Sequence, residues 1–247
     1  MNYQYAEFVK NKKVAIVGPA QYMAGSGFGK EIDEFDIVVR LNRSCESIEK
    51  FYHDIGKRTD ILYSCLIEKP ANAGVIDINV FKDKYGIKHI CAPPASDMKG
   101  YARSTSLHPL VNIVKVKKIN EQIPVRIVDH VFHSSLGNKV DCRPNTGYMA
   151  IYDLLRYDIE KLKIFGFSFY LDGFIEGVKS GIENEQNKSE AEFALQCFRS
   201  KRHNQKNMWE YAKKTLTNNP KVELDNMLEK ILNLENLDKN LFKSIKK

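Results

Sequence analysis

The chain lacks the sequence features that mark small disulfide-bonded proteins, metal proteins and most nucleic-acid binders. Its five cysteines are scattered, odd in number and contain no Cys-x-x-Cys pair, so we expect free thiols in a reducing compartment. No zinc-finger spacing and no aromatic RNA-binding motif accompanies the basic charge, so nucleic acid is not an expected partner. No Asp-x-Asp pair stands at a predicted strand end, and no histidines gather at metal-ligand spacing.

The length and the charge set the scale of the fold and the kind of ligand. With 247 residues the chain can bury a full hydrophobic core, and it suits one α/β domain with an appendage. The net charge of +7 and the isoelectric point near 9.0 predict a surface that attracts phosphates, acidic glycans or anionic lipid headgroups. Residues 1–11 are polar and aromatic, without a signal peptide or a membrane span, so we expect a cytoplasmic protein.

Two short apolar runs near the start predict neighbouring buried strands that end in polar residues. Residues 14–17 stop at Gly18, which lets the backbone leave the strand without a Cβ clash, and residues 37–41 stop at Asn42. Open α/β sheets bind ligands at the carboxyl ends of their strands. The pattern therefore predicts a nucleotide site at this edge, and Ser64, at the end of a third strand, is expected to face the same cleft together with Tyr63.

Further along the chain, strand and helix patterns alternate. We predict strands over residues 60–65, 88–92, 125–128 and 162–167, and helices over 46–54, 75–85, 147–159, 191–198 and 208–216. A helix is also expected over 107–118, where the valine and isoleucine content leaves a strand open. This order predicts a single Rossmann-like, doubly wound, mainly parallel sheet.

The C-terminal segment, residues 218–247, is expected to be an amphipathic helical tail beside a catalytic domain of residues 1–217. Apolar residues form stripes there among lysine, glutamate and asparagine. Such a stripe packs back on the domain or against a second subunit, as in a homo-oligomer. The alternative is a basic tail that touches the membrane surface at the inner face, where a lipid-linked acceptor would lie.

Two blocks of the sequence resemble the motifs of one enzyme family. Gly18, followed by residues 25–33, 36–42 and 55–60, resembles the large sialyl motif of the sialyltransferases, glycosyltransferase family 29. Residues 143–148 and 165–167 resemble the small sialyl motif. Vertebrate members link the two motifs by a disulfide, but Val14 and the region of Ile159 take those positions here, so no such bridge is implied.

The resemblance implies a GT-A-variant fold and a definite reaction. Sialic acid passes from CMP-sialic acid to a glycan hydroxyl by single displacement with inversion, through an oxocarbenium-like transition state. Because the leaving group bears one phosphate, hydrogen-bond donors can neutralise it in place of a metal ion. We therefore expect no metal and no cofactor besides the CMP-sugar. The acceptor is expected to be a galactose-bearing surface glycan or a lipid-linked oligosaccharide.

The resemblance also implies a set of donor-binding residues. Asn42 matches the nucleotide-contacting asparagine of the large motif, although a loop asparagine in a turn is the alternative. Pro19 stands where relatives have a second asparagine, and Gln21 or Tyr22 is expected to replace it. Besides Gly18, Asn42 and Ser64, the predicted donor-binding residues are Gln21, Ser26, Asn145, Thr146 and Gly147.

The last three of these match the Ser-Thr-Gly of the small motif. A hydroxyl and backbone N–H groups at a helix start suit the sugar carboxylate or the phosphate, whereas ordinary capping by Asn145 or Thr146 is the alternative. Ser26 lies in the glycine-rich loop of residues 25–29, whose alternative interpretation is a flexible loop that opens a helix and holds no phosphate.

His203 is the predicted general base. It precedes Trp209-Glu210 as in the last family motif, although Glu210 is farther away than usual, and an imidazole has its pKa near the operating pH. A solvated histidine in a basic loop is the alternative. The segment 168–173 resembles bacterial sialyltransferases of family 42, in which tyrosines donate to the leaving phosphate. Tyr170 is the matching candidate, and a core tyrosine is its alternative.

Three other functions remain open at this stage. The first is a transferase that uses CMP-Kdo. The second is an NAD(P)-binding oxidoreductase, although Ala20 and Met23 occupy positions where its fingerprint needs glycine. The third is a non-catalytic glycan-binding relative.

Overall fold

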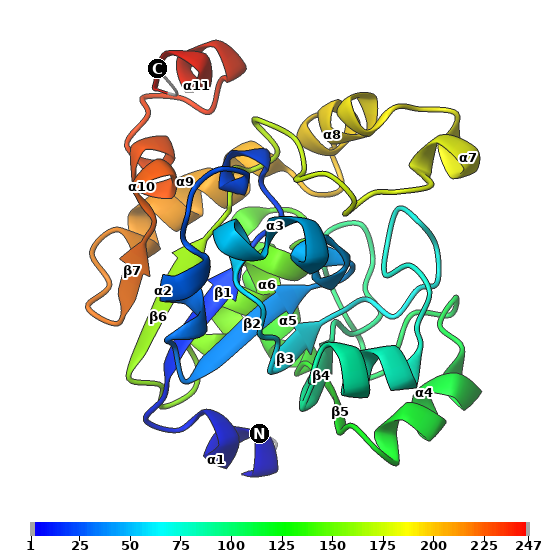
Figure 1. The fold of residues 1–247 in the computed structure, drawn as a ribbon. Coiled ribbons are helices and arrows are strands. Elements are labelled where there is room, and N and C mark those ends of the chain that lie inside the picture. Colours follow the sequence, from blue (N-terminus) through cyan, green and yellow to red (C-terminus); the bar gives the residue numbers. More distant parts are fainter. Residues whose placement is uncertain (1–2, 246–247) are drawn as a thin grey trace.

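In the computed structural model, which describes residues 3–245, seven strands form one sheet in the order β5-β4-β3-β2-β1-β6-β7, and each neighbouring pair is parallel (Figure 1). The strands are β1 (Lys13–Val17), β2 (Ile37–Leu41), β3 (Ile61–Tyr63), β4 (His89–Ala92), β5 (Val125–Ile127), β6 (Lys161–Phe165) and β7 (Val222–Leu224). The predicted doubly wound α/β fold is confirmed.

Alternate residues of each central strand enter two different hydrophobic clusters. Val14 and Ile16 of β1 pack on one face of the sheet, whereas Ala15 and Val17 pack on the other. All four are at most 1% exposed. A strand that is buried on both faces has no polar positions to alternate with, which is why this run is apolar throughout.

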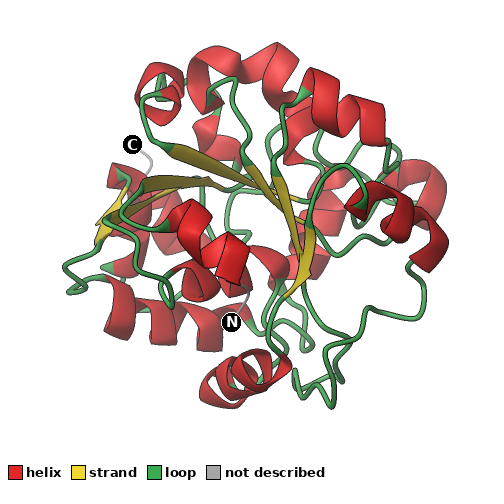
Figure 2. Ribbon diagram, turned by 90° about the horizontal axis from the view of Figure 1, so that it is seen from below, coloured by secondary structure: helices red, strands yellow, loops and turns green. Residues whose placement is uncertain are grey.

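Helices cover both faces of the sheet (Figure 2). One face is covered by α1 (Tyr3–Val9), α5 (His130–Val140), α6 (Thr146–Leu154), α9 (Gln205–Leu216), α10 (Asn226–Leu232) and α11 (Lys239–Ile245). The other face is covered by α2 (Gly29–Asp33), α3 (Ile48–Ile55), α4 (Ile113–Asn120), α7 (Ile182–Gln186) and α8 (Glu190–Phe198). Short turns of other helical types occur at η1 (Gln21–Met23), η2 (Ser44–Ser47) and the π-helical η3 (Val80–Lys84).

Several elements differ from the sequence prediction. The helix expected over 75–85 is largely reduced to η3, and α1, α5 and α7 were not predicted. Residues 222–224, assigned to a helical tail, form β7 and pair with β6. Val222 and Leu224 alternate with Glu223, a spacing that fits an edge strand as well as the start of a helical stripe, so the pattern alone could not separate the two.

The rest of the C-terminal segment packs back on the domain. Leu228, Ile231 and Phe242 are at most 3% exposed and join the same cluster as β1. The indole N–H of Trp209 in α9 donates to the carbonyl oxygen of Ile231 at 2.9 Å. The apolar stripe is thus buried in the core. Of the alternatives for this segment, the structure favours packing on the domain over contact with a membrane. The boundary at residue 217 stays a prediction.

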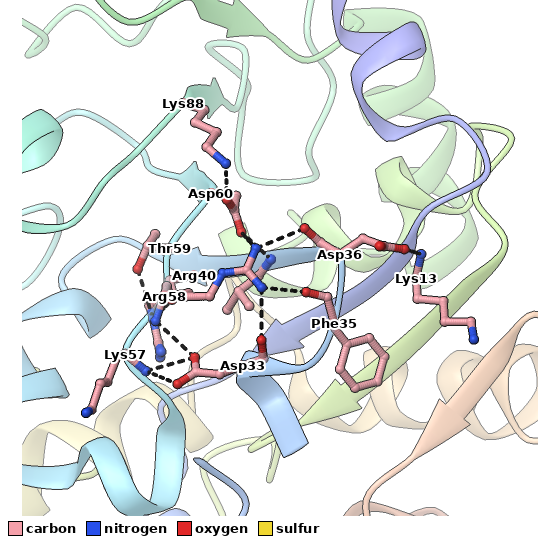
Figure 3. Close-up of polar contacts among 11 residues, drawn as sticks. Lys13, Asp33, Phe35, Asp36, Arg40, Lys57, Arg58, Thr59, Asp60 and Lys88 are labelled. Carbon is pink, nitrogen blue, oxygen red and sulfur yellow. Dashed lines mark hydrogen bonds and ion pairs between the residues drawn. The ribbon is translucent and has the colours of Figure 1, made fainter. Parts of the chain in front are cut away.

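A polar network ties together the amino ends of the strands (Figure 3). The carboxylate of Asp60, 4% exposed, accepts hydrogen bonds from the Val38 backbone N–H and from the side chains of Arg58 and Lys88. Arg40 is fully buried and donates to four acceptors in residues 55–59, among them the carbonyl oxygens of Ile55 and Gly56. This part of the large motif therefore holds the sheet together, at the edge opposite the strand ends that bind ligands.

All five cysteines are free, as predicted, and Cys45, Cys91 and Cys142 are buried. Within residues 3–245, no helix has both the length and the hydropathy needed to span a bilayer.

Candidate active site

The strand order reverses between β1 and β6, and the chain leaves both strands through glycine. A Cβ at Gly18 would lie 2.3 Å from the carbonyl oxygen of Gly166, and Gly166 has a φ of +73°. The two strand ends can therefore approach only because neither residue has a side chain. In sheets of this kind the crevice at such a reversal is the ligand site.

A pocket of about 530 Å³ opens at this reversal. Its wall includes residues that follow β1, β2 and β6, the start of α6, and the connection before α9. Six of the predicted site residues line it, namely Asn42, Asn145, Thr146, Gly147, Tyr170 and His203. Residues that are far apart in the chain thus meet in one cavity.

Asn42 is held in a left-handed conformation, with a φ of 46°. Its Oδ1 accepts the backbone N–H of Cys65 at 3.0 Å, and its own N–H donates to the carbonyl oxygen of Tyr63 at 2.8 Å. Both interpretations of this residue are therefore true of its geometry: it is a turn asparagine and it lines the pocket. Because Oδ1 is occupied, the Nδ2 donors are the part of the amide available to a ligand.

At the start of α6, helix capping and contact with the pocket fall to two different residues of the small motif. Asn145 is the N-cap, since its Oδ1 accepts the backbone N–H of Tyr148 at 2.9 Å. Thr146, the first helical residue, is therefore not needed for capping, and it lines the pocket. Gly147 allows close packing, because a Cβ there would lie 2.8 Å from Leu41 and 2.9 Å from Phe167.

The loop segment of Arg202 and His203 is tied to the small motif by two hydrogen bonds. Its Nδ1–H donates to the carbonyl oxygen of Arg143 at 2.7 Å, and the Arg143 N–H donates to the carbonyl oxygen of Arg202 at 3.0 Å. A carbonyl oxygen can only accept, so Nδ1 carries the proton and Nε2 keeps its lone pair. The imidazole is thus oriented as a base.

Burial lowers the pKa of His203 to about 4, and the charges of Arg143 and Arg202 act in the same direction, against the hydrogen bond to the Arg143 carbonyl. The ring is therefore neutral near pH 7. Glu210, by contrast, is exposed on α9 and faces Lys206 at 3.9 Å, so it is not the partner of the imidazole.

The charged groups of the pocket wall are mainly cationic. Arg143, Arg202, Lys69 and Lys179 line it, whereas Glu185 is the one carboxylate among the lining residues. Burial, together with the neighbouring Arg202, lowers the pKa of Arg143 to about 10. Such a wall favours an anionic ligand, because anions relieve the cost of burying unpaired cations.

Tyr170 lies on strained backbone. Phe169 and Tyr170 have φ angles of 52° and 60°, which is uncommon for residues with a side chain. Its ring contacts Phe174 edge-on, with centroids 5.3 Å apart, and burial raises the pKa of its phenol. The hydroxyl therefore stays protonated and remains a hydrogen-bond donor. It packs on the core and lines the pocket at once, so the two interpretations of this tyrosine again coincide.

Four of the predicted donor residues do not line the pocket. Gly18 acts through the close approach described above, and Gln21 is exposed outside the cavity. Ser26 Oγ donates to the backbone carbonyl of Asp54, so the glycine-rich loop holds α3 rather than this site. The Ser64 hydroxyl is buried and accepts the Leu66 N–H. The hydroxyls of Ser26 and Ser64 thus make structural contacts in place of the predicted cleft position.

Tyr63, expected beside Ser64 in the cleft, is fully buried on the other side of the strand. Its hydroxyl hydrogen-bonds that of Tyr5 at 2.9 Å and donates to Asp153 at 2.8 Å. Successive side chains of a strand point to opposite faces, so the two could not share one cleft from within a strand.

Comparisons with known proteins agree with this geometry. The family model "Glycosyltransferase family 29 (sialyltransferase)" matches residues 4–169. The chain belongs to this family. No curated protein sequence matches the chain significantly.

Two solved structures illustrate the shared fold of this family 29 chain. A mammalian sialyltransferase matches with a TM-score of 0.50 and 15% identity, over 86% of this chain and 68% of its own. A point variant of the sialyltransferase CstII from Campylobacter jejuni, in complex with CMP, matches with a TM-score of 0.50 and 15% identity, over 83% and 78%. The predicted glycosyltransferase class is confirmed by the family match.

The sequence prediction of the site does not include the four cations that line the pocket, Lys69, Arg143, Lys179 and Arg202. Of these, Arg143 lies at the start of the block that resembles the small motif. Pairing with the small motif could have suggested Arg143. No sequence signal marked Lys179, because a lysine in a loop is normally solvated.

Among residues 3–245, no group of three or more His, Cys, Asp or Glu side chains is placed to hold a metal ion. Whether transfer by this family 29 chain needs a metal is a separate question, and metal independence stays a prediction.

Proposed function

We propose that this chain transfers sialic acid from CMP-sialic acid to a glycan hydroxyl, with inversion, without a metal ion, and with His203 as the general base. Family membership supports the reaction class. The observation that carries the mechanism is a pair of hydrogen bonds. The imidazole Nδ1–H of His203 donates to the Arg143 carbonyl oxygen, and the Arg143 N–H donates to the carbonyl oxygen of Arg202, which holds the ring beside the start of α6. Both CMP, in the solved CstII complex, and the acceptor trisaccharide, in another, are ligands of a protein with the same fold.

The base step follows from the fixed tautomer. Nε2 of His203 accepts the proton of the acceptor hydroxyl while that oxygen attacks the anomeric carbon of the sugar. The bond from this carbon to the phosphate oxygen breaks, and its electron pair leaves with CMP. Attack opposite the leaving group inverts the anomeric centre.

The low pKa of the free imidazole is compatible with this role. Burial, Arg143 and Arg202 lower the pKa of His203 in the ligand-free protein. An anionic donor bound among these cations opposes the two arginines and brings the pKa of His203 back toward its ordinary value. The base is then strongest when the donor is in place.

The donor cradle is made of hydrogen-bond donors. Asn42, Thr146 and Gly147 line one cavity. In the proposed mechanism the Nδ2 donors of Asn42, the hydroxyl of Thr146 and the N–H groups at the start of α6 bind the sugar nucleotide. The phenol of Tyr170 donates to the leaving phosphate. The cavity of about 530 Å³ has room for a sugar nucleotide.

Direct turnover tests the proposal. Purified protein is incubated with CMP-sialic acid and a galactose-terminated acceptor, with and without EDTA, and released CMP and sialylated product are measured. We expect equal turnover in both, and a product of inverted configuration by NMR. Turnover that EDTA abolishes and Mg²⁺ restores would contradict the metal-free mechanism.

A donor and ligand screen separates the alternatives. Transfer from CMP-Kdo but not from CMP-sialic acid would change the proposed donor sugar from sialic acid to Kdo. Calorimetric binding of CMP and acceptor without turnover would identify a glycan-binding relative. Binding of NADH without CMP would contradict the glycosyltransferase proposal altogether.

A further inference from the structure

Lys179 is a buried lysine in the wall of the pocket. It lies between β6 and α7 and is 7% exposed. Its Nζ donates one hydrogen bond, to the carbonyl oxygen of Ala71 at 2.7 Å. It also lies 5.4 Å from the ring centroid of Phe174 and 5.6 Å from that of Phe193. One N–H of the ammonium group is satisfied by the protein, and the aromatic faces provide the rest of its attraction.

Within the described part of the chain, no carboxylate forms an ion pair with Lys179. Glu185 lines the same pocket, but its Oε2 accepts the backbone N–H of Ala71 at 2.8 Å. The thiols of Cys65 and Cys197 are neutral, since burial raises the pKa of each. Burial also lowers the pKa of Lys179. The charge of Glu185 acts on the ammonium without a direct ion pair and raises its pKa, and the charge of Arg43 opposes that effect. A buried ammonium without a direct ion pair is costly, and a bound anion would offset that cost.

The position of Lys179 relative to Tyr170 indicates which anion. Phe174 contacts the ring of Tyr170 on one side and the ammonium of Lys179 on another, so both groups belong to one wall. The start of α6, with Thr146, supplies neutral donors elsewhere in the cavity. Among the cations that line the pocket, Lys179 is the one whose ammonium lies over Phe174, the ring that contacts Tyr170.

We propose that Lys179 binds the phosphate of the nucleotide donor and neutralises the charge that grows there as the sugar leaves. This proposal rests on the proposed function. The bond between the anomeric carbon and the phosphate oxygen breaks heterolytically, and CMP departs with one more negative charge. In this proposal Lys179 acts as its ammonium form, so its part in the step is electrostatic and transfers no proton.

The test compares two ligands that differ only in the phosphate. Binding of CMP and of cytidine is measured by calorimetry for the wild type and for Lys179→Met, which keeps the length of the side chain and suits the aromatic surroundings. We expect the CMP dissociation constant to rise at least about tenfold, and cytidine binding to stay unchanged. CMP carries no sugar carboxylate, so a loss on CMP identifies the phosphate.

Lys50→Met is the matched control. Lys50 forms an ion pair at 2.5 Å with Glu176, which lies in the same loop as Lys179. Lys50 itself is a surface residue outside the pocket. Loosening of the loop would therefore weaken CMP binding in Lys50→Met as well. Loss of a contact with the phosphate would weaken CMP binding only in Lys179→Met. If Lys179→Met does not fold, judged by its thermal midpoint, Lys179→Gln is measured in its place.

Three results would overturn the proposal. Equal weakening of CMP and cytidine would assign Lys179 a structural role through Ala71. Unchanged CMP binding with a raised KM for an acidic acceptor would assign it to the acceptor. Unchanged CMP binding and unchanged kinetics would assign it no role in the site. A wild type that binds neither CMP nor cytidine would instead contradict the proposed function itself.

Discussion

Residues 4–169 and residues 170–245 contribute different things to the same pocket. The first region is the one that the family model matches, and it holds β1 to β6 with Asn42 and Thr146, which line the pocket and which we propose as donor-binding residues. The second region brings Tyr170, Lys179 and His203 to the same pocket. The residues proposed for the reacting end of the donor, at its phosphate and at the acceptor hydroxyl, thus come from outside the part that the family model matches.

The two regions are joined by a few buried polar contacts. Asp225, 2% exposed, accepts the Gly166 N–H at 2.8 Å and the Tyr22 hydroxyl at 2.7 Å. The backbone of Arg143 is paired with residues 202–203. If the two regions contribute in this way, three kinds of variant should differ. Loss of a contact between the regions should lower the stability, loss of the proposed base should lower the transfer rate, and loss of a proposed donor-binding group should weaken CMP binding.

The largest effect is expected at His203. His203→Ala should lower the transfer rate at least about 10²-fold, because the acceptor hydroxyl loses its base, while CMP binding should change little. Initial rates and calorimetry on the same preparation separate the two quantities. Glu210→Gln is the control, since Glu210 is exposed outside the pocket, and its rate should equal that of the wild type. A wild-type rate in His203→Ala would remove His203 from the mechanism.

Asp225→Ala should break the link between the regions. It leaves the Gly166 N–H and the Tyr22 hydroxyl without their acceptor and removes the N-cap bond to Leu228 at 2.8 Å. We expect a loss of about 3 kcal/mol in the free energy of unfolding, measured by urea denaturation.

Asp238→Ala provides the comparison for that variant. Asp238 accepts the backbone N–H groups of Asn240 and Leu241 in an exposed turn of the same segment, so its loss should cost about 1 kcal/mol or less. Equal losses of unfolding free energy in the two variants would show that the contacts of Asp225 between the regions add no stability beyond that of an ordinary helix cap.

Asn42→Asp should affect binding without removing the turn. A carboxylate still accepts the Cys65 N–H, but it cannot donate and it repels an anionic ligand. We expect the CMP dissociation constant to rise about tenfold, by calorimetry, with a thermal midpoint close to that of the wild type. Asn42→Gly, which keeps the left-handed backbone, is expected to weaken binding less because it adds no charge. Tighter binding by Asn42→Asp would contradict the cradle.

The smallest effect concerns pH. His133 is fully buried, its Nδ1–H donates to the Gly100 carbonyl at 3.0 Å, and burial lowers its pKa to about 4. Between about pH 6.5 and pH 4 the unfolded chain binds a proton that the folded chain does not, so stability falls as the pH falls.

His133→Asn keeps a donor for Gly100 and cannot be protonated. Between about pH 7 and pH 5.5 it should lose about 1 kcal/mol less stability than the wild type, measured by urea denaturation at both values. An identical pH dependence in the two proteins would show that His133 does not titrate as its burial requires.

The sheet and the cradle were readable because they depend on neighbours in the chain. Residues 14–17 had to be apolar to be buried on both faces, and a polar residue directly after a parallel strand, such as Asn42, reaches the ligand edge wherever the helices lie. Ser64 and Tyr63 show the limit of that rule. Their order along the chain was right, but the hydrogen bonds that draw them inward come from Leu66 and Asp153, and the latter lies 90 residues away.

The sequence by itself determined the parallel α/β sheet, the family and the position of the nucleotide edge, since strand burial and the glycine exits are local properties. Only the tertiary structure decided that residues 222–224 complete the sheet and that Thr146 is free while Asn145 caps. The same holds for the placement of His203 and Lys179 in the pocket wall. Each of these depends on contacts between segments that are far apart in the chain, and no local pattern specifies which distant partner a side chain will meet.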